Sequence, residues 1–237
     1  SEFHDILPGS SIQPVEDMSI RVMDHALEII SRLKAKAFFA LAAGQPVAEE
    51  NHIPIILRET ESFLLQLLRW NSPKRILEIG TSMGYSASCF ATVCEGSRIL
   101  TVENNEEIFE RAVETIGDLD LSERIHVFLG DGVDVMERLI YKTNVEGLDQ
   151  FDFIFIDAAK SHYRRFFDVA LKLVKDKGMI VCDNALMNGR TVSDTYDRLN
   201  KHKTNMTNMR EFIDYITTMK GVITTLIPVG DGLTLSI

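Results

Sequence analysis

Short runs of nearly continuous apolar residues alternate along the chain with stretches in which apolar residues recur every three or four positions. The apolar runs favour β-strands that are buried on both faces, as in a parallel sheet. We expect five such strands, at residues 75–80, 97–104, 124–131, 151–158 and 178–184. The stretches between them predict helices at residues 84–95, 105–118, 133–141 and 161–175. This alternation predicts βαβ units with right-handed crossovers, and therefore an α/β fold with a doubly wound, mostly parallel sheet.

The C-terminal stretch breaks the alternation. Residues 221–230 and 231–237 are two β-like runs joined at the sequence Val-Gly-Asp-Gly. An Asp-Gly pair between such runs is a strong hairpin signal, so the last strand should run antiparallel to its neighbours. Residues 193–209 are polar and rich in asparagine, which predicts an exposed insertion near the functional site.

Two amphipathic stretches precede the first strand, at residues 17–43 and 59–70, and their apolar spacing predicts helices. No internal repeat or linker interrupts the chain. We therefore expect a single domain over residues 1–237, with a helical extension over 1–58 and the α/β core over 59–237.

Composition narrows the possible classes of function. The net charge of −10 argues against a broad nucleic-acid-binding face. No apolar run approaches the roughly 20 residues that span a bilayer, and the first residues show no signal-peptide pattern. The three cysteines, Cys89, Cys94 and Cys182, form neither a disulfide framework nor a Cys-x-x-Cys metal motif. We therefore expect a cytoplasmic protein that binds neither membrane nor nucleic acid.

A glycine turn follows the first predicted strand, in the sequence Leu-Glu-Ile-Gly-Thr-Ser-Met-Gly-Tyr-Ser at residues 77–86. In open α/β sheets the ligand lies beyond the carboxyl ends of the strands, and glycines let the backbone approach it closely. The spacing is G-x-x-x-G rather than G-x-G-x-x-G, which weakens a dinucleotide interpretation. Glu78 would repel a pyrophosphate but suits a cationic ligand, such as the sulfonium and ammonium groups of S-adenosylmethionine.

Two further signals lie at consecutive strand ends. Glu103 ends the second predicted strand, the usual place for an acid that accepts both ribose hydroxyls. Gly130, Asp131 and Gly132 end the third strand, where an adenine could lie. The alternatives are that Glu78 is a helix-end charge, Glu103 an N-terminal cap and the Gly-Asp-Gly sequence a simple turn. Agreement at three consecutive strand ends favours a ligand site.

The fourth and fifth predicted strands end in oxygen-bearing side chains. Asp157 and then Lys160 follow the fourth strand, and Asp183 and Asn184 follow the fifth. Adjacent parallel strands would gather these groups into one cluster. Two carboxylates and an amide oxygen suit Mg²⁺ most, with Ca²⁺ or Mn²⁺ also possible, and there is no soft ligand to favour Zn²⁺. The alternative is that each acid caps the helix that follows it.

Four stretches together resemble a known family: residues 77–86, 151–163, 181–189 and 227–235. From about Thr60 onward the chain resembles the cation-dependent O-methyltransferases that include the caffeoyl-CoA and catechol enzymes. The resemblance implies a Rossmann-like methyltransferase fold, S-adenosylmethionine as methyl donor, a divalent cation and a homodimer. It is weak over the N-terminal third and over residues 193–209.

The resemblance also implies roles for single residues on the cofactor side. Glu78, Gly80 and Ser86 match positions at the methionine part of the cofactor, and Glu103 matches the ribose-binding acid. The remaining expected cofactor contacts are Ile56, Thr81, Ser82, Asp131, Gly132 and Asp157. Ile56 aligns with a polar contact in plant members, which makes it a departure.

On the acceptor side, Asp157, Asp183 and Asn184 match the metal ligands, and Asp157 is also expected to take part in catalysis. Lys160 matches the catalytic lysine and a substrate contact, and Asn188 matches a second substrate contact. Ala159 stands where the family usually has a second Asp, so this side-chain contact to the cofactor is absent.

The predicted function is transfer of a methyl group to one hydroxyl of a vicinal aromatic diol, a small catechol-like molecule. An NAD(P)-dependent oxidoreductase is an alternative, opposed by the missing G-x-G-x-x-G motif. A regulatory module that only binds S-adenosylmethionine is another, but it would need neither Lys160 nor a metal site. An RNA acceptor is disfavoured by the negative charge of the chain.

Overall fold

The structure is a computed structural model that describes residues 56–193 and 203–237. The chain divides into two units, Ser1–Val47 and Ala48–Ile237, and every described residue belongs to the second. The helix expected at 17–43 lies outside the described residues. The single-domain organisation therefore stays a prediction.

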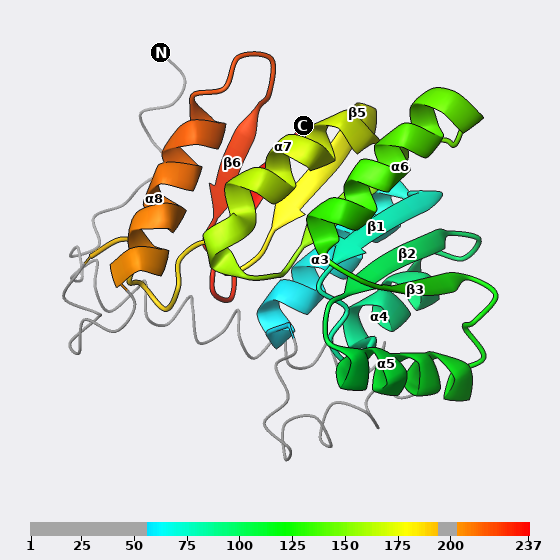
Figure 1. Ribbon diagram of the computed structural model, residues 1–237. Coiled ribbons are helices and arrows are strands. Elements are labelled where there is room, and N and C mark those ends of the chain that lie inside the picture. Colours follow the sequence, from blue (N-terminus) through cyan, green and yellow to red (C-terminus); the bar gives the residue numbers. More distant parts are fainter. Residues whose placement is uncertain (1–55, 194–202) are drawn as a thin grey trace, which may run out of the picture. The chain divides into compact units, whose positions relative to one another are not determined.

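Seven strands form one sheet in the order β3-β2-β1-β4-β5-β7-β6 (Figure 1). The strands are β1 (Arg75–Ile79), β2 (Arg98–Glu103), β3 (Ile125–Leu129), β4 (Phe151–Ile156), β5 (Val174–Cys182), β6 (Thr224–Ile227) and β7 (Leu233–Ser236). The first five pair in parallel, and β7 pairs antiparallel with both β5 and β6. The predicted α/β class, the mostly parallel sheet and the antiparallel C-terminal hairpin are confirmed.

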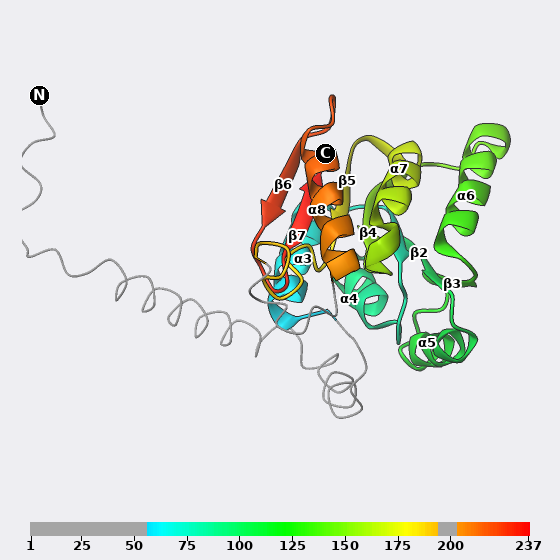
Figure 2. The same ribbon diagram turned by 60° about the vertical axis from the view of Figure 1, so that its left-hand side comes forward.

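Helices cover both faces of the sheet, as the views in Figures 1 and 2 show together. One face carries α3 (Arg58–Asn71), α4 (Tyr85–Val93) and α5 (Glu106–Asp118); the other carries α6 (Gly132–Glu146), the 3₁₀ turn η1 (Lys160–His162), α7 (Tyr163–Leu173) and α8 (Lys203–Thr217). Across residues 56–193 and 203–237, none of the helices is both long enough and apolar enough to cross a lipid bilayer.

The central strand β4 is buried along its whole length because every one of its positions faces either one helical layer or the other. On the α4 side, Phe90 packs edge-on against Phe155 with ring centroids 5.6 Å apart. On the α7 side, Phe212 of α8 packs edge-on against Tyr163 and Phe167 at 5.6 and 5.7 Å. Edge-to-face aromatic pairs stabilise a core beyond their buried area, and these fix the helices that flank the carboxyl ends of the strands.

The structure corrects the last part of the exposed insertion predicted at residues 193–209, and residues 194–202 lie outside the described residues. Residues 203–209 form the first turns of α8. Met206 and Met209 are buried, and Phe212 and Ile216 continue the same face at helical spacing. The polar residues between them occupy the other face of the helix, so the stretch is amphipathic rather than an exposed loop. Two other predicted boundaries differ from the observed ones. The strand β5 begins at Val174 instead of 178, and α6 extends to Glu146 instead of 141.

Candidate active site

The parallel register brings the carboxyl ends of neighbouring strands level with one another. The backbone N–H of Asp157 donates to the carbonyl of Ile79 at 2.9 Å, and that of Asp183 donates to the carbonyl of Ile156 at 3.0 Å. A cavity of about 440 Å³ lies at these ends, and we call it the strand-end cavity. The predicted site residues that line it are Gly80, Ser82, Glu103, Asp131, Gly132, Asp157 and Lys160.

Gly80 is required where β1 passes β4. Its φ is +101°, and a Cβ at this position would lie 2.0 Å from the carbonyl oxygen of Asp157. No side chain fits this contact, and L-residues rarely adopt this φ. The glycine turn therefore serves two purposes, since it brings two strand ends together and it leaves bare backbone along the cavity.

The Glu103 carboxylate forms part of the cavity wall and is held by backbone groups. Oε1 accepts from the N–H groups of Asn104 and Asn105 at 2.9 and 3.0 Å, and Oε2 accepts from the N–H of Ser82 at 3.0 Å. The cap of α5 is a different residue, Asn105, whose Oδ1 accepts from the N–H of Ile108 at 3.0 Å. The alternative in which Glu103 caps this helix is therefore wrong.

Asp131 does act as a helix cap. Its Oδ1 accepts from the N–H groups of Val133 and Asp134 at 2.9 and 3.2 Å, at the beginning of α6. The residue also lines the strand-end cavity. The Gly-Asp-Gly sequence can therefore form a helix-capping turn and line a ligand site at the same time.

Glu78 is completely buried between β1 and α4. The hydroxyl of Ser86 donates to Oε1, and the hydroxyl of Thr101 donates to Oε2 at 2.6 Å. Thr81 extends the network, with its hydroxyl 2.6 Å from that of Thr101. Burial raises the pKa of Glu78 to about 7; the hydrogen bonds from Ser86 and Thr101 lower it, and the charge of Asp157 raises it further.

The strand-end cavity is lined by neither Glu78, Thr81 nor Ser86. These three predicted cofactor contacts form a polar network behind the glycine turn. Ile56 is buried at the beginning of α3 and also does not line this cavity. Direct contact of these four residues with a cofactor stays a prediction.

Asp157, Asp183 and Asn184 form what we call the oxygen cluster, and Lys160 lies among them. The Lys160 ammonium is 3.2 Å from Oδ1 of Asp157 and also donates to Oδ1 of Asn184. Burial, followed by the charge of Asp157, raises the pKa of Asp183 to about 7. A cation beside Asp183 would stabilise the ionised form of this carboxylate against the charge of Asp157.

The donor set of the oxygen cluster fits a hard divalent cation. It offers two carboxylates and one amide oxygen, without a sulfur or imidazole ligand. Within the described part of the chain, no group of three or more His, Cys, Asp or Glu side chains could hold a metal ion. A metal at this place would therefore depend on Asn184 as its third protein ligand.

The loop after β5 has an unusual backbone. Asn184, Met187 and Asn188 all have positive φ, between 50° and 55°. Non-glycine residues in this region are uncommon, and they concentrate at functional sites where the surroundings enforce them. The hairpin turn enforces them here, because the N–H groups of Ala185 and Leu186 donate to backbone carbonyls of the turn at residues 231–232, each at 2.8 Å. Asn188 is exposed at the end of this loop.

The strand-end cavity is also lined by residues that the sequence pattern did not single out, among them Asn104, Ile108, His162, Arg165 and Phe166. Asn104 directly follows Glu103, so its position after a strand end could have identified it. His162 and Arg165 lie in a stretch predicted as one continuous helix. The 3₁₀ turn η1 precedes α7 instead, and it changes which side chains face the cavity.

The sequence profile of the O-methyltransferase family matches residues 44–237. The chain belongs to the O-methyltransferase family. The predicted family and enzyme class, an S-adenosylmethionine-dependent O-methyltransferase, are thereby confirmed.

Individual members of the family are similar over most of the chain. Caffeoyl-CoA O-methyltransferase 2 of Populus trichocarpa is 30% identical over 181 residues, which cover 73% of this chain and 70% of the relative. Catechol O-methyltransferase of Niastella koreensis is 31% identical over 156 residues, covering 65% of this chain and 69% of the relative. The crystal structure of a candidate caffeoyl-CoA O-methyltransferase from Staphylococcus aureus has a TM-score of 0.81 at 27% identity, covering 89% of this chain and 97% of that one.

Proposed function

We propose that this O-methyltransferase methylates one hydroxyl of a vicinal aromatic diol, with S-adenosylmethionine as methyl donor and a divalent cation bound at the oxygen cluster. One observation carries the proposal. Lys160 lines the same cavity as Glu103, and its ammonium contacts Asp157 and Asn184. Lys160, Asp157 and the candidate ribose-binding acid Glu103 thus line one cavity, while Asp183 and Asn184 lie beside it without lining it.

On the cofactor side, the residues act by binding and orientation. Glu103 is held rigidly by three backbone N–H groups, so its carboxylate can accept ribose hydroxyls without reorganising. Gly80 allows the methionine part to approach bare backbone. Asp131 and Gly132 line the part of the cavity at the end of β3, where we place the adenine. The sulfonium group supplies the methyl that is transferred.

On the acceptor side, Asp157, Asp183 and Asn184 would hold the cation, most simply Mg²⁺, which would supply electrostatic stabilisation of a deprotonated acceptor oxygen. Lys160 takes up the hydroxyl proton when its side chain is the neutral amine, or, as the ammonium, holds the phenolate by charge. Asn188, at the exposed end of the loop after β5, contacts the acceptor. Holding the two reactants in line contributes much of the acceleration.

The diol as acceptor is supported by two relatives. The caffeoyl and catechol groups in their names both contain a vicinal aromatic diol. Two adjacent oxygens can chelate one cation, which matches a site with only three protein ligands and room for further ones. A module that merely binds S-adenosylmethionine would have no use for Lys160 within the oxygen cluster.

Turnover of a panel of phenols tests the proposal. Catechol, caffeoyl esters and flavonoid diols would be incubated with S-adenosylmethionine, beside matched monophenols, with and without EDTA. We expect methylation of the diols alone, loss of activity in EDTA and recovery with Mg²⁺. Full activity in excess EDTA, by protein that retains no metal after dialysis, would contradict the cation site. Equal turnover of monophenols would contradict the acceptor class.

We also propose the cellular compartment, the oligomeric state and the kind of partner. The three cysteines, Cys89, Cys94 and Cys182, are buried and unpaired, which supports a reducing compartment such as the cytoplasm. A homodimer is proposed from the family resemblance. The partner is a small molecule rather than nucleic acid or membrane.

A further inference from the structure

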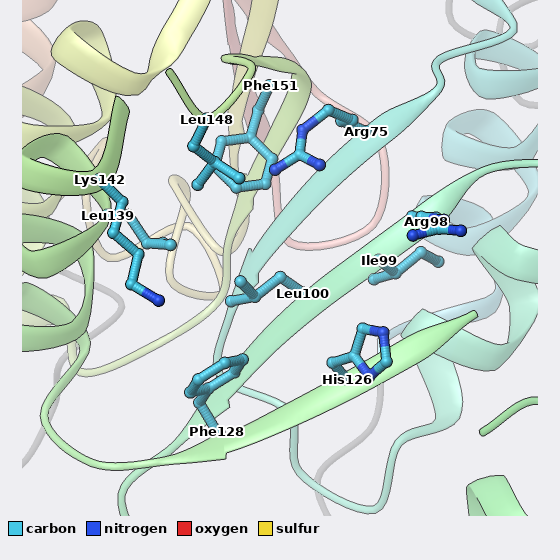
Figure 3. Close-up of a pocket in the computed structure, with 10 residues that line it drawn as sticks. All are labelled: Arg75, Arg98, Ile99, Leu100, His126, Phe128, Leu139, Lys142, Leu148 and Phe151. Carbon is cyan, nitrogen blue, oxygen red and sulfur yellow. The ribbon is translucent and has the colours of Figure 1, made fainter. Parts of the chain in front are cut away.

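A second cavity, of about 230 Å³, lies over the strands β1, β2 and β3 on the side of α6, and we call it the remote pocket (Figure 3). Arg75 and Arg98 line it from the beginnings of β1 and β2. The strand-end cavity lies at the other ends of the same strands. The two cavities share no lining residue, so the remote pocket is not part of the candidate active site.

The floor and walls of the remote pocket are apolar and partly aromatic. Leu100 of β2 forms the floor, and the rings of Phe128 and Phe151 line two sides. Phe128 is 45% exposed, although it lies in a strand. Phe128 is continuous with the apolar lining around it, and a contiguous apolar surface that is open to water often marks a binding site.

Cationic side chains surround this apolar floor without any acid. The lining includes the cations Arg75, Arg98 and Lys142, and contains no Asp or Glu. This is unusual in a chain of net charge −10. Arg98 and Lys142 make no ion pair within the described part of the chain. In Figure 3, Arg75 approaches the space over Leu100 from the β1 side and Lys142 from the α6 side.

Arg75 provides the strongest evidence that the remote pocket binds an anion. Its guanidinium lies 5.0 Å from the centroid of the Phe151 ring. Its Nε is buried and has no hydrogen-bond acceptor among the described residues. The nearby carboxylate of Asp152 is already engaged by the backbone N–H groups of Lys74 and Arg75, at 2.8 and 2.7 Å, and by Lys175. A buried donor without an acceptor costs free energy, which an anion in the pocket would recover.

The geometry points to the remote pocket as a binding site for a small aromatic anion, a single ring that carries a carboxylate or phosphate group. A cavity of about 150 Å³ holds benzene, so about 230 Å³ suits one substituted ring. The ring packs between Phe128 and Phe151, and the anionic group faces Arg75, Arg98 and Lys142. Charge complementarity selects an anion over a neutral ring. This site does not depend on the proposed function.

Calorimetric titration of the full chain with matched probes tests this site. The probes are 4-ethylbenzoate, phenyl phosphate and the uncharged 4-ethylbenzyl alcohol. We expect the alcohol to bind at least about tenfold more weakly than the better anion, and a comparison of the two anions identifies the preferred group. In the double variant Arg98→Gln and Lys142→Gln, affinity for the anion should fall at least about tenfold. Lys172→Gln, on an exposed part of α7 outside the pocket, should leave it unchanged.

Three results would overturn the assignment. Equal affinity for the alcohol and the anions would show that the remote pocket binds apolar rings without selecting for negative charge. Loss of binding in Lys160→Ala, with retention in the double variant, would place the anion in the strand-end cavity. Absence of anion binding, together with conversion of a dimer into a monomer by Phe128→Ser in sedimentation experiments, would make this face a subunit interface.

Discussion

The hydroxyl of Tyr163 donates a hydrogen bond to the backbone carbonyl of Asp183 at 2.9 Å, which links the first turn of α7 to the end of β5. The same hydroxyl lies 3.3 Å from the Lys160 ammonium. One buried phenol therefore holds the strand end that carries two members of the oxygen cluster and also contacts the lysine between them. Tyr163 is a positioning residue in this arrangement.

Tyr163→Phe should keep the aromatic packing against Phe212 and lose only the hydroxyl. The buried carbonyl of Asp183 would lose a donor, so we expect the free energy of unfolding to fall by about 1–3 kcal/mol. Loss of the contact to Lys160 should lower kcat about fivefold and shift the pH–rate profile, while KM for the methyl donor stays constant. Steady-state kinetics and urea unfolding of the same preparation check this. A variant with reduced stability but an unchanged pH–rate profile would leave Tyr163 a purely structural role.

Lys160→Met keeps much of the side-chain volume and removes the charge. If the lysine acts on the acceptor, kcat should fall about 10²–10⁴-fold. Affinity for S-adenosylmethionine, measured by titration calorimetry, should change by less than about threefold. Lys172→Met, at an exposed position of the following helix, is the matched control and should behave as the wild type. Wild-type kcat at neutral pH in Lys160→Met would remove this residue from the mechanism.

Glu78 makes the stability of the protein depend on pH. Its pKa is raised from 4.5 to about 7 in the folded state, chiefly by burial. The folded state therefore holds the proton more tightly, and this contribution to stability is complete below pH 4.5 and is lost as the pH rises through about 7. One pKa unit corresponds to about 1.4 kcal/mol, so the contribution is about 3 kcal/mol.

The variant Glu78→Gln is permanently neutral and isolates this effect. The free energy of unfolding of the wild type, minus that of Glu78→Gln, should decrease by about 2–3 kcal/mol between pH 5 and pH 8. Asp183 titrates in both proteins, so its contribution cancels. Denaturant unfolding at a series of pH values measures the difference, with the exposed Glu107→Gln as control. A difference that stays constant with pH would show that Glu78 remains ionised in the folded protein.

Gly80→Ala should be far more damaging than a glycine substitution at similar φ elsewhere. The matched control is Gly96→Ala, since Gly96 has φ +82° and a Cβ there would meet no atom within 4 Å. Both variants carry the backbone strain, but only Gly80→Ala adds the clash with the carbonyl of Asp157. We expect an additional loss of about 3 kcal/mol in the free energy of unfolding, together with weaker cofactor binding. Equal thermal stability of the two variants would contradict the close approach of β1 and β4.

Glu103→Gln should weaken S-adenosylmethionine binding about 10–100-fold, because the carboxylate loses its charge and one acceptor oxygen. Stability should fall as well, since three backbone N–H groups donate to this carboxylate. Asn105→Ala provides the contrast: it removes the cap of α5 and should lower stability by about 1 kcal/mol without changing cofactor affinity. Calorimetric titration and thermal melting of both variants separate the two roles. Unchanged affinity in Glu103→Gln would move this acid out of the cofactor site.

The sequence predicts best where one local pattern decides the structure. The run at 151–156 is apolar at most positions, and the structure buries all of it as a central strand. Asp231-Gly232 identifies the hairpin, although the connection extends over residues 228–232 between β6 and β7. The three groups of the oxygen cluster follow from strand order alone, since parallel strands end at the same edge.

Other features depend on contacts between distant residues. The burial of Glu78 requires Ser86 and Thr101 to supply donors, and no local pattern shows that they face it. The beginning of α8 is hard to predict because most of its residues are polar. Met206 and Met209 are identified as core residues only by their burial in the structure. The residue that caps α5 is Asn105 and not Glu103. The cap lies two residues after the acid that ends β2, and the sequence pattern alone does not fix this boundary.

The hydrogen bonds between the loop after β5 and the hairpin turn affect when this loop can become ordered during translation. Backbone carbonyls at residues 231 and 232 accept from Ala185 and Leu186, beside Asp183 and Asn184. A ribosome-bound chain can emerge with all the sheet's parallel strands paired and still have this loop unformed. The loop beside Asp183 and Asn184 gains these two hydrogen bonds only after the segment through Gly232 has left the exit tunnel. A chain that ends before residue 231 would therefore lack the two backbone hydrogen bonds that hold this loop against the hairpin turn.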